Sequence, residues 1–509
     1  MGASTKIVTL KAAQNISKEA KGRGECVVLA HGVFDLLHLG HVRHLEAARH
    51  EGDVLIVSVT DDAYVNKGPD RPIFPTLMRV EMLASLGTVD WVVINDAPTA
   101  IPVLQKIEPN IYIKGNEYSH AEDDITGMIA EEQLAVEASG GRIAFTSDIV
   151  FSSSALINKY MNVHDPSLRE YLEDFSHHTS LDDIFSLIDQ VVNFRVLLVG
   201  DAIIDEYQFV RSMGKSSKEN MIAAKFLDRE EYCGGVFAAA NHVAGFCQDV
   251  EIITCLGAQE TGEDLAKKQL KPNVKLNYVL RDNAPTTRKC RFVDSNYLRK
   301  MFEVYHFDDK PLPSSRQEKF DSMVAERAAD FDVVIVTDFG HGLIAESTIR
   351  VLEQKARFLA VNAQSNSANH GFNLITKYSK ADYICIDEPE ARLAVTDKDN
   401  GVEEVIREKL VPETGCDRII VTRGEFGCMP YDKGKPMHSV PAFTRTIIDS
   451  VGAGDAFLAI TSPLAATGAS MDVVGFIGNA VGALKVGIVG HRASVGKVPL
   501  IKYITHLLK

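Results

Sequence analysis

The sequence predicts an α/β protein with two doubly wound domains, each built on a mostly parallel sheet. Apolar runs of strand length alternate with amphipathic stretches of helical length in both halves of the chain, a pattern typical of parallel sheets covered by helices. The 509 residues also exceed what one hydrophobic core ordinarily organises. A mixed, charged stretch separates the two alternating regions. We therefore predict domains at 1–160 and 195–509, joined by a helical linker at 161–194.

The first domain alternates helices and strands from its beginning. A leading helix is predicted at 9–21, and the first apolar strand follows at 26–30. Ligands of such sheets bind at the carboxyl ends of the strands, where the following loops gather. The later elements are helices at 41–50, 76–86 and 100–107 and strands at 54–59, 91–94 and 111–113.

A histidine-bearing stretch, residues 31–41, joins the first strand to the next helix. Unpaired N–H groups and the positive end of a helix dipole make such a junction suitable for a polyphosphate. His38 and His41 are three residues apart and can face the same side of this entrance, and Gly40 lets the backbone come close. Two histidines alone would be as consistent with an exposed loop. The strand before them and the helix after them favour phosphate binding.

This stretch resembles the GxFDxxHxGH signature of the nucleotidyltransferases typified by glycerol-3-phosphate cytidylyltransferase and the heptose-phosphate adenylyltransferases. The resemblance covers residues 9–160 and implies a Rossmann-like fold. It implies that His38, His41 and Lys67 act on a nucleoside triphosphate whose α-phosphate is attacked in line, without a covalent enzyme intermediate. Without the resemblance, Lys67 could equally be a solvated side chain and the serines after residue 151 an N-cap. The implied nucleotide-binding residues are Gly32, Phe34, Asp35, Gly40, Arg79, Lys114, Ser152, Ser153 and Ser154.

The second domain opens on a new apolar strand at 196–199. Five more strands are predicted after it, with helices between them, at 250–255, 333–336, 358–361, 383–386 and 419–421. The most informative stretch is 449–457, in which the small residues Gly452, Ala453 and Gly454 precede a helix. Their N–H groups can converge on an anion, and Asp455 can accept a proton. A lone GxGD could also be a glycine-rich turn with a capping aspartate.

The run Val451 to Phe457 resembles the C-terminal signature of the ribokinase-like (PfkB-type) carbohydrate kinases, over residues 195–509. The resemblance implies a ribokinase-like domain that uses ATP, with Asp455 as catalytic base and residues 452–454 as anion hole. It implies that Thr422 and Gly424 lie on the nucleotide side and that Asp387 and Glu390 organise Mg²⁺. The implied substrate-binding residues are Asp201, Asp205, Gly234, Gly235 and Asn241.

Composition limits the setting and the partners of the chain. The formal net charge of −15 argues against a nucleic-acid binder, so anionic substrates must be held by helix ends and a few basic residues. The eight cysteines are scattered and form no CxxC pair, which indicates reduced thiols. The sequence shows no signal-peptide pattern and no apolar run of about 18 residues, so we expect a cytoplasmic protein without membrane insertion.

The two halves also occur, kinase first, in the bifunctional heptose-phosphate kinase and adenylyltransferase of lipopolysaccharide precursor synthesis, and here their order is reversed. The resemblance implies phosphorylation of a sugar or polyol, then nucleotidyl transfer from CTP or ATP, giving a nucleoside-diphosphate sugar and pyrophosphate. It also implies a homodimer. The alternative is a degenerate kinase-like domain that serves as a binding or dimerisation module. That alternative is motivated by residues 236–239, which stand where an asparagine commonly follows the double glycine.

Overall fold

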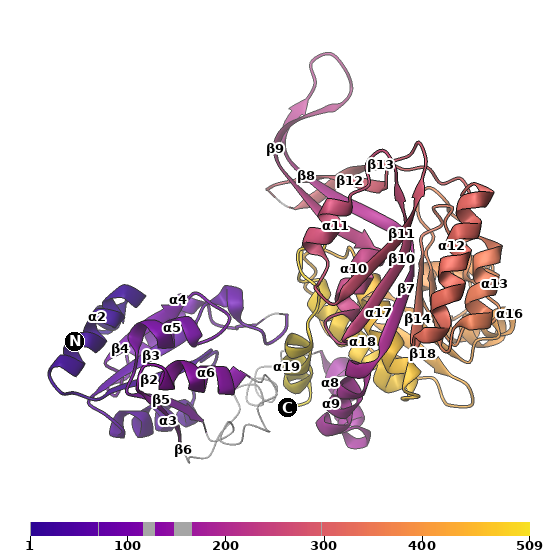
Figure 1. Ribbon diagram of the computed structural model, residues 1–509. Coiled ribbons are helices and arrows are strands. Elements are labelled where there is room, and N and C mark those ends of the chain that lie inside the picture. The colour runs from indigo at the N-terminus through magenta and orange to yellow at the C-terminus, as the bar shows by residue number, and fades with distance from the viewer. Residues whose placement is uncertain (1, 70, 116–127, 147–164, 297) are drawn as a thin grey trace. The chain divides into compact units, whose positions relative to one another are not determined.

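The computed structural model describes residues 2–69, 71–115, 128–146, 165–296 and 298–509 (Figure 1). The chain forms two compact units. The first comprises residues 1–169 with 501–509, and the second comprises residues 170–500. No helix in these described ranges combines the length and the apolar composition that a membrane crossing requires.

The first unit is built on a six-stranded parallel sheet with the order β1-β4-β3-β2-β5-β6. The chain runs outward from β2 through β3 to β4 and then crosses back to β5 on the other side of β2. This change of direction is a topological switch point, where open α/β sheets bind their ligands. The strands are β1 (Ile7–Val8), β2 (Val27–Gly32), β3 (Val54–Thr60), β4 (Trp91–Asn95), β5 (Ile111–Gly115) and β6 (Arg142–Thr146).

Helices cover both faces of this sheet, which confirms the doubly wound prediction. One core packs Leu45 and Leu83 against the sheet, and the other packs Val103 and Val136 against the opposite face. Burial on both faces explains why the strands read as continuous apolar runs. The helices are α1 (Ala3–Lys6), α2 (Leu10–Gly22), α3 (Leu39–His50), η1 (Asp62–Tyr64), α4 (Thr76–Ala84), α5 (Ile101–Ile107) and α6 (Met128–Glu137).

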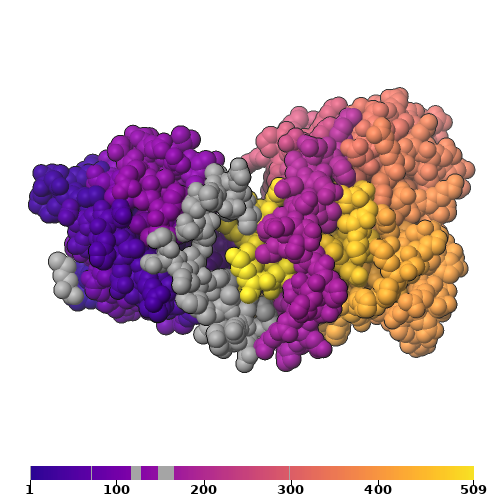
Figure 2. Space-filling view, turned by 90° about the horizontal axis from the view of Figure 1, so that it is seen from below, coloured from indigo at the N-terminus to yellow at the C-terminus, as the bar shows by residue number. Residues whose placement is uncertain are grey.

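Two helices of the predicted linker, α8 (Pro166–His178) and α9 (Leu181–Gln190), belong mostly to the second unit. The ring of Phe175 stacks on that of Phe476, with centroids 4.2 Å apart and planes 9° apart. The apolar face of α9 is also buried. Figure 2 shows the purple surface of α8 and α9 against the yellow C-terminal part of this unit. Apolar packing therefore joins α8 and α9 to the core of the second unit.

The main sheet of the second unit has the order β11-β10-β7-β14-β15-β16-β17-β18 and is parallel except for β18. Its strands are β7 (Arg195–Gly200), β10 (Asp249–Gly257), β11 (Val274–Arg281), β14 (Val333–Asp338), β15 (Leu359–Ala363), β16 (Tyr383–Asp387), β17 (Arg418–Thr422) and β18 (Cys428–Asp432). Its helices are α10 (Val236–Val243), α11 (Glu263–Gln269), α12 (Ser314–Arg327), α13 (Glu346–Lys355), α14 (Glu388–Ala394), α15 (Val402–Glu404), η7 (Val405–Leu410), α16 (Val411–Thr414), α17 (Ala453–Ala466) and α18 (Met471–Lys485). The last helix, α19 (Lys497–Leu507), is divided between the two units at residue 501.

A second, four-stranded sheet was not among the predicted elements. Its order is β13-β12-β8-β9, and β8 and β9 form a long hairpin that projects from the unit (Figure 1). The outer half of this hairpin is exposed on nearly every residue, so its sequence lacks the apolar alternation by which strands are recognised. The strands are β8 (Ala202–Lys215), β9 (Ile222–Gly235), β12 (Thr287–Asp294) and β13 (Arg299–His306).

Candidate active sites

The histidine stretch of the first unit lies at the carboxyl end of β2, at the switch point of the sheet. His38 is the N-cap of α3, and its Nδ1 accepts a hydrogen bond from the N–H of Gly40 at 3.1 Å. The N–H of His38 points in turn to Nδ1 of His41, at 3.4 Å. The two rings lie side by side, with centroids 4.0 Å apart. Both histidines therefore lie at the start of one helix, which brings them together as predicted.

Both imidazoles are held in their neutral form. Burial and the nearby charge of Lys67 lower the pKa of His38. Burial, reinforced by His38 and Lys67, lowers the pKa of His41 to about 3. Because Nδ1 of His38 accepts a hydrogen bond, its neutral ring carries the proton on Nε2, where it can donate to an oxygen anion. The structure thus brings Lys67 close to both histidines. The lysine and the helix N-terminus provide positive potential there, and the neutral imidazoles add hydrogen-bonding groups.

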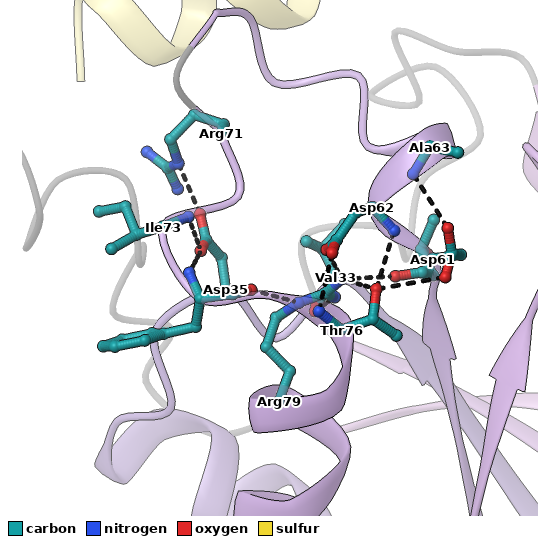
Figure 3. A network of polar contacts seen from close by, with 11 residues as sticks. Val33, Asp35, Asp61, Asp62, Ala63, Arg71, Ile73, Thr76 and Arg79 are labelled. Atoms are coloured by element: carbon teal, nitrogen blue, oxygen red, sulfur yellow. Dashed lines mark hydrogen bonds and ion pairs between the residues drawn. The ribbon is translucent and has the colours of Figure 1, made fainter. Parts of the chain in front are cut away.

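Asp35 anchors a second loop to the histidine stretch (Figure 3). Its fully buried carboxylate accepts from Nε of Arg71 at 2.5 Å and from the N–H of Ile73 at 2.6 Å. Each of these contacts fixes the loop that follows Lys67 against the loop that precedes His38. In the structure, Asp35 therefore holds both loops in position and presents no exposed carboxylate.

Arg79 has the same clamping arrangement from α4 (Figure 3). Its guanidinium is fully buried and donates to the carbonyl oxygens of Val33, Thr60 and Phe74, the last two at 2.9 Å. It also forms an ion pair with Asp62 at 2.6 Å. Three loops at the carboxyl edge of the sheet are thus joined by one side chain. The donors of Arg79 are directed to the protein in this structure, whereas the resemblance implied contact with a nucleotide.

The other residues predicted for this site fall into three groups. Phe34 is almost buried, has a φ of 51°, and its ring lies against Gly32, where a Cβ would come within 3.2 Å of a ring carbon. Lys114 forms an ion pair with Glu132 at 2.9 Å, and its charge helps to lower the pKa of His31, so it lies near the loop. The predicted serines Ser152, Ser153 and Ser154 lie outside the described residues.

The second unit contains a cavity of about 490 Å³ between the main sheet, the small sheet and the start of α17. A volume of this size suits a nucleotide with a small substrate. Of the residues predicted for this unit, those that line the cavity are Asp205, Gly235, Asp387, Glu390, Thr422, Gly424, Gly452, Ala453, Gly454 and Asp455.

One wall of the cavity is the N-terminal turn of α17. Gly452 is the N-cap, with a φ of 75°, a conformation that side chains rarely adopt. Asp455 follows on the first turn. Burial raises its pKa, an effect that the charge of Asp205 strengthens and that His491 and Lys289 oppose. A carboxylate with a raised pKa is a stronger base, as proton transfer from a hydroxyl requires. The anion cradle and the base predicted from the sequence are therefore adjacent.

Two further acidic residues, Asp387 and Glu390, form a capping box at the start of α14. Glu390 N–H donates to Asp387 at 2.7 Å, and Asp387 N–H donates back at 3.0 Å. Burial and the charge of Asp387 raise the pKa of Glu390, and burial raises the pKa of Asp387. A divalent cation would relieve this repulsion, so the pair fits Mg²⁺. Because no cluster of three or more ligating side chains occurs in the described part of the chain, phosphate oxygens would have to complete its coordination.

The substrate side of the cavity contains three cationic or ionisable groups that were not predicted as site residues: Lys289, Arg291 and His491. Arg291 pairs with one oxygen of Asp205, and Nε2 of His491 lies 3.1 Å from the other. Burial would raise the pKa of Asp205, but the hydrogen bond from His491 and the charge of Arg291 hold it well below its usual range. Lys289 and Arg291 come from β12, a strand of the sheet that was not predicted. This is why their convergence was hidden in the sequence.

Three of the predicted substrate-binding residues are not among those that line the cavity. Asp201 is buried and accepts from the N–H of Phe339 at 2.9 Å, and burial beside Asp338 raises its pKa to about 7. Gly234 packs against Asp205, where a Cβ would lie 2.0 Å from a carboxylate oxygen. The side chain of Asn241 bonds to the backbone of residues 269 and 271. In this structure all three support the cavity wall from behind.

Two family models match the two parts of the chain. Residues 193–497, more than half of the chain, match the model of the pfkB family carbohydrate kinases, and residues 29–159 match the cytidylyltransferase-like family. Solved structures similar to the chain include phosphofructokinase-2 from Escherichia coli, with a TM-score of 0.51, 16% identity and coverage of 62% of this chain and 100% of that one. Ribokinase from Thermotoga maritima gives a TM-score of 0.50, 18% identity and coverage of 61% and 99%. At these identities the likeness shows the fold alone.

Curated relatives match over a shorter length. The bifunctional protein HldE of Ectopseudomonas mendocina is 39% identical over 148 residues, which are 28% of this chain and 30% of the relative. HldE of Nitratiruptor sp. is 47% identical over 129 residues, 25% of this chain and 28% of the relative. The match lies in the N-terminal region and spans less than a third of these relatives. The order of the two units is the reverse of that in HldE.

Proposed function

The chain belongs to the pfkB family of carbohydrate kinases, and we propose that its second unit transfers a phosphoryl group from ATP to a hydroxyl of a sugar or sugar phosphate. The observation that carries the proposal is the placement of Asp455 on the same helical turn as the Gly452–Gly454 cradle, facing the 490 Å³ cavity. Asp455 takes the hydroxyl proton, and the N–H groups of the cradle stabilise the charge on the phosphoryl group in transit. Thr422 and Gly424 lie on the nucleotide side.

Asp387 and Glu390 are the residues that would hold Mg²⁺ together with the nucleotide. When bound, the ion neutralises charge on the phosphate oxygens. The raised pKa of Glu390 supports this assignment, because a divalent cation would favour the ionised form of this buried carboxyl beside Asp387.

The basic residues on the substrate side of the cavity favour a substrate that is already anionic. Arg291 pairs with Asp205 and with Glu303, whereas Lys289 forms no ion pair with a described residue; Lys289 is buried, with its Nζ 5.3 Å from the ring centre of Phe339. A buried cation that lacks an acidic partner of its own is stabilised by an anionic ligand. We infer that the acceptor carries a phosphate, as a heptose-like sugar phosphate does.

We further propose that the first unit transfers a nucleotidyl group from CTP or ATP to a sugar or polyol phosphate and releases pyrophosphate. The neutral pair His38 and His41, with Lys67, supports this role because donors and a cation face one helix entrance. A sugar phosphorylated in one unit and activated in the other would leave as a nucleoside-diphosphate sugar. The HldE relatives, which are bifunctional by name, support the pairing of two activities.

Two substitutions in the full chain separate the activities. With Asp455→Asn, ADP formation on a panel of sugar phosphates should fall by roughly 10²–10⁴-fold, because a general base contributes about that much. Pyrophosphate release from CTP or ATP should be unchanged. With His41→Ala the pattern should reverse. A wild-type protein that phosphorylates no sugar, and whose nucleotidyl transfer ignores Asp455→Asn, would favour a degenerate second unit that serves as a binding or dimerisation module.

The projecting hairpin supports a homodimer. Its outer half exposes Met213, Met221, Ile222 and Phe226, each by more than half of its surface. A two-stranded ribbon that projects into water is only marginally stable by itself. An exposed apolar patch is typical of a protein interface, and pairing with a second copy would cover this patch. We propose that two copies pair through these hairpins. Sedimentation should show a dimer for the wild type and a monomer for Ile222→Glu combined with Phe226→Glu, whereas an unchanged dimer would place the interface elsewhere.

A further inference from the structure

His491 lies between the substrate side of the kinase cavity and its anion cradle. Its Nε2 is 3.1 Å from a carboxylate oxygen of Asp205. The other edge of its ring covers Gly452, where a Cβ would come within 2.4 Å of Cε1 and 3.0 Å of Nδ1. The side chain is 6% exposed and lines the cavity. The imidazole thus lies against both Asp205 and Gly452.

The backbone on both sides of His491 is fixed. The N–H of Gly490 donates to Asp449 at 2.8 Å, and the carbonyl of Gly490 accepts from Nζ of the buried Lys485 at 2.7 Å. The same ammonium donates to the carbonyl of Val451, next to the cradle, at 2.8 Å. The following residue, Arg492, forms an ion pair with Glu230 at 2.8 Å. These contacts leave His491 little freedom to move away from Gly452.

One nitrogen of this fixed ring lacks a partner. Nδ1 of His491 is buried and accepts or donates no hydrogen bond to any described residue. A buried polar atom without a partner destabilises the folded protein, and native proteins keep few of them. Since Nδ1 lies against Gly452, the atom best placed to become its partner is an oxygen of a phosphate bound at the cradle.

We propose that His491 is a further phosphate-contacting residue of the kinase site, and the proposal rests on the kinase function proposed above. Asp205 accepts from Nε2–H and stabilises the imidazolium form, in which Nδ1–H donates to an oxygen of the phosphoryl group in transit. The proton at Nδ1 is taken from solvent when the phosphate binds and returns to solvent when the product leaves. No bond to phosphorus is made by His491. Its effect is to add a charged donor to the N–H groups of the cradle.

Other ionisable groups surround His491 and must be considered when proton uptake is measured. Several of them interact electrostatically with His491 or with its partner Asp205. Because these groups can also exchange protons on ligand binding, proton uptake is informative only as a difference between wild type and variant. They are Asp205 of β8, His242 of α10, Lys289 and Arg291 of β12, Asp455 of α17 and Lys485 of α18.

Paired substitutions at His491 separate the two edges of the ring. His491→Gln places an amide near the position of Nε2 and can keep the bond to Asp205, but it offers nothing at Nδ1. His491→Asn places an amide near Nδ1 and can restore a donor there. His438→Gln is the matched control, because His438 is an exposed histidine of the same unit. The probes are MgADP alone and MgADP with aluminium fluoride, which mimics the phosphoryl group in transit. Their binding to the full chain is measured by calorimetry. Two buffers of different ionisation enthalpy are used so that proton uptake can be obtained.

We expect MgADP to bind wild type and all variants within about twofold. The aluminium fluoride complex should bind His491→Gln at least tenfold more weakly than wild type, His491→Asn should recover part of this loss, and wild type should take up more protons than His491→Gln. Equal binding and equal proton uptake in His491→Gln would overturn the proposal, and so would a parallel loss of MgADP binding in both variants, which would indicate a structural role. If wild type binds neither probe, the kinase function fails and the role of His491 fails with it.

Discussion

Gly452→Ala is the substitution that most directly tests the architecture of the kinase cradle. Residue 452 has a φ of 75°, in the left-handed region, where an alanine is strained. Its new Cβ would lie 2.4 Å from Cε1 of His491. Carbon atoms normally approach to about 3.5–4.0 Å, so the ring would have to retreat by about 1 Å. The contacts of Gly490 and Arg492 oppose that movement.

The expected cost has two parts. The left-handed backbone costs an alanine roughly 1–2 kcal/mol. Overpacking against a fixed side chain adds about 1–3 kcal/mol. The second unit should therefore lose about 2–5 kcal/mol of unfolding free energy. A displacement of the cradle by about 1 Å should also lower the kcat of phosphoryl transfer by roughly 100-fold.

The assay is calorimetric unfolding together with ADP formation at saturating ATP. Gly454→Ala is the stability control, because its Cβ would meet no atom within 4 Å and its backbone is not left-handed. We expect that control to leave the melting temperature unchanged or slightly raised. Pyrophosphate release by the first unit provides an activity control within the same molecule. A Gly452→Ala protein with the melting temperature and kcat of the wild type would refute the close contact between Gly452 and His491.

Three further predictions concern buried charge. Burial and Lys114 lower the pKa of His31 to about 3. Below pH 6.5 His31 therefore binds a proton in the unfolded chain but not in the folded chain. Unfolding midpoints should therefore fall as the pH drops from 6.5 toward 3, and less steeply for His31→Gln; identical pH profiles would contradict this. Arg79→Lys cannot serve the acceptors on three loops, and should cost about 2–4 kcal/mol and reduce pyrophosphate release but not ADP formation, as denaturant titration and both assays would show. Lys289→Met should raise the KM for a sugar phosphate by about 10–100-fold, the loss of one charge-assisted bond, but not the KM for a neutral sugar. An equal rise for both would exclude a phosphate contact.

The residues proposed for each site could be brought together from the sequence because each group is local. His38 and His41 lie within one helical turn, and the Gly452 to Asp455 run places the proposed cradle and base within four residues. A short segment whose own hydrogen bonds set its shape can be interpreted from residue types and spacing. The inner strands of both main sheets were equally accessible, because burial on two faces leaves a continuous apolar run. The edge strands β1, β6, β11 and β18 were not predicted.

The rest of each site depends on contacts across long stretches of sequence. Arg291 meets Asp205, 86 residues away, only because β12 pairs with β8 in the four-stranded sheet, and no local pattern specifies a pairing between strands so far apart in the sequence. Arg79 joins loops that begin 46 and 19 residues earlier. The residue type alone does not distinguish a basic side chain that binds a ligand from one that holds a loop in place. Burial decides between them, and Arg79 is fully buried.

The two proposed sites share one electrostatic arrangement for binding anions in an acidic chain. A chain with a net charge of −15 repels nucleotides and sugar phosphates at long range, so binding must come from groups within a few ångströms. In each unit the start of a helix lies at the proposed site, and one lysine, Lys67 or Lys289, lies near it. Close, partly buried contacts are screened much less by salt than surface charges are, so they can hold an anion at physiological ionic strength although the molecule as a whole is acidic. The acidic surface then sets how rarely substrates arrive, and the two helix entrances set how firmly they are held.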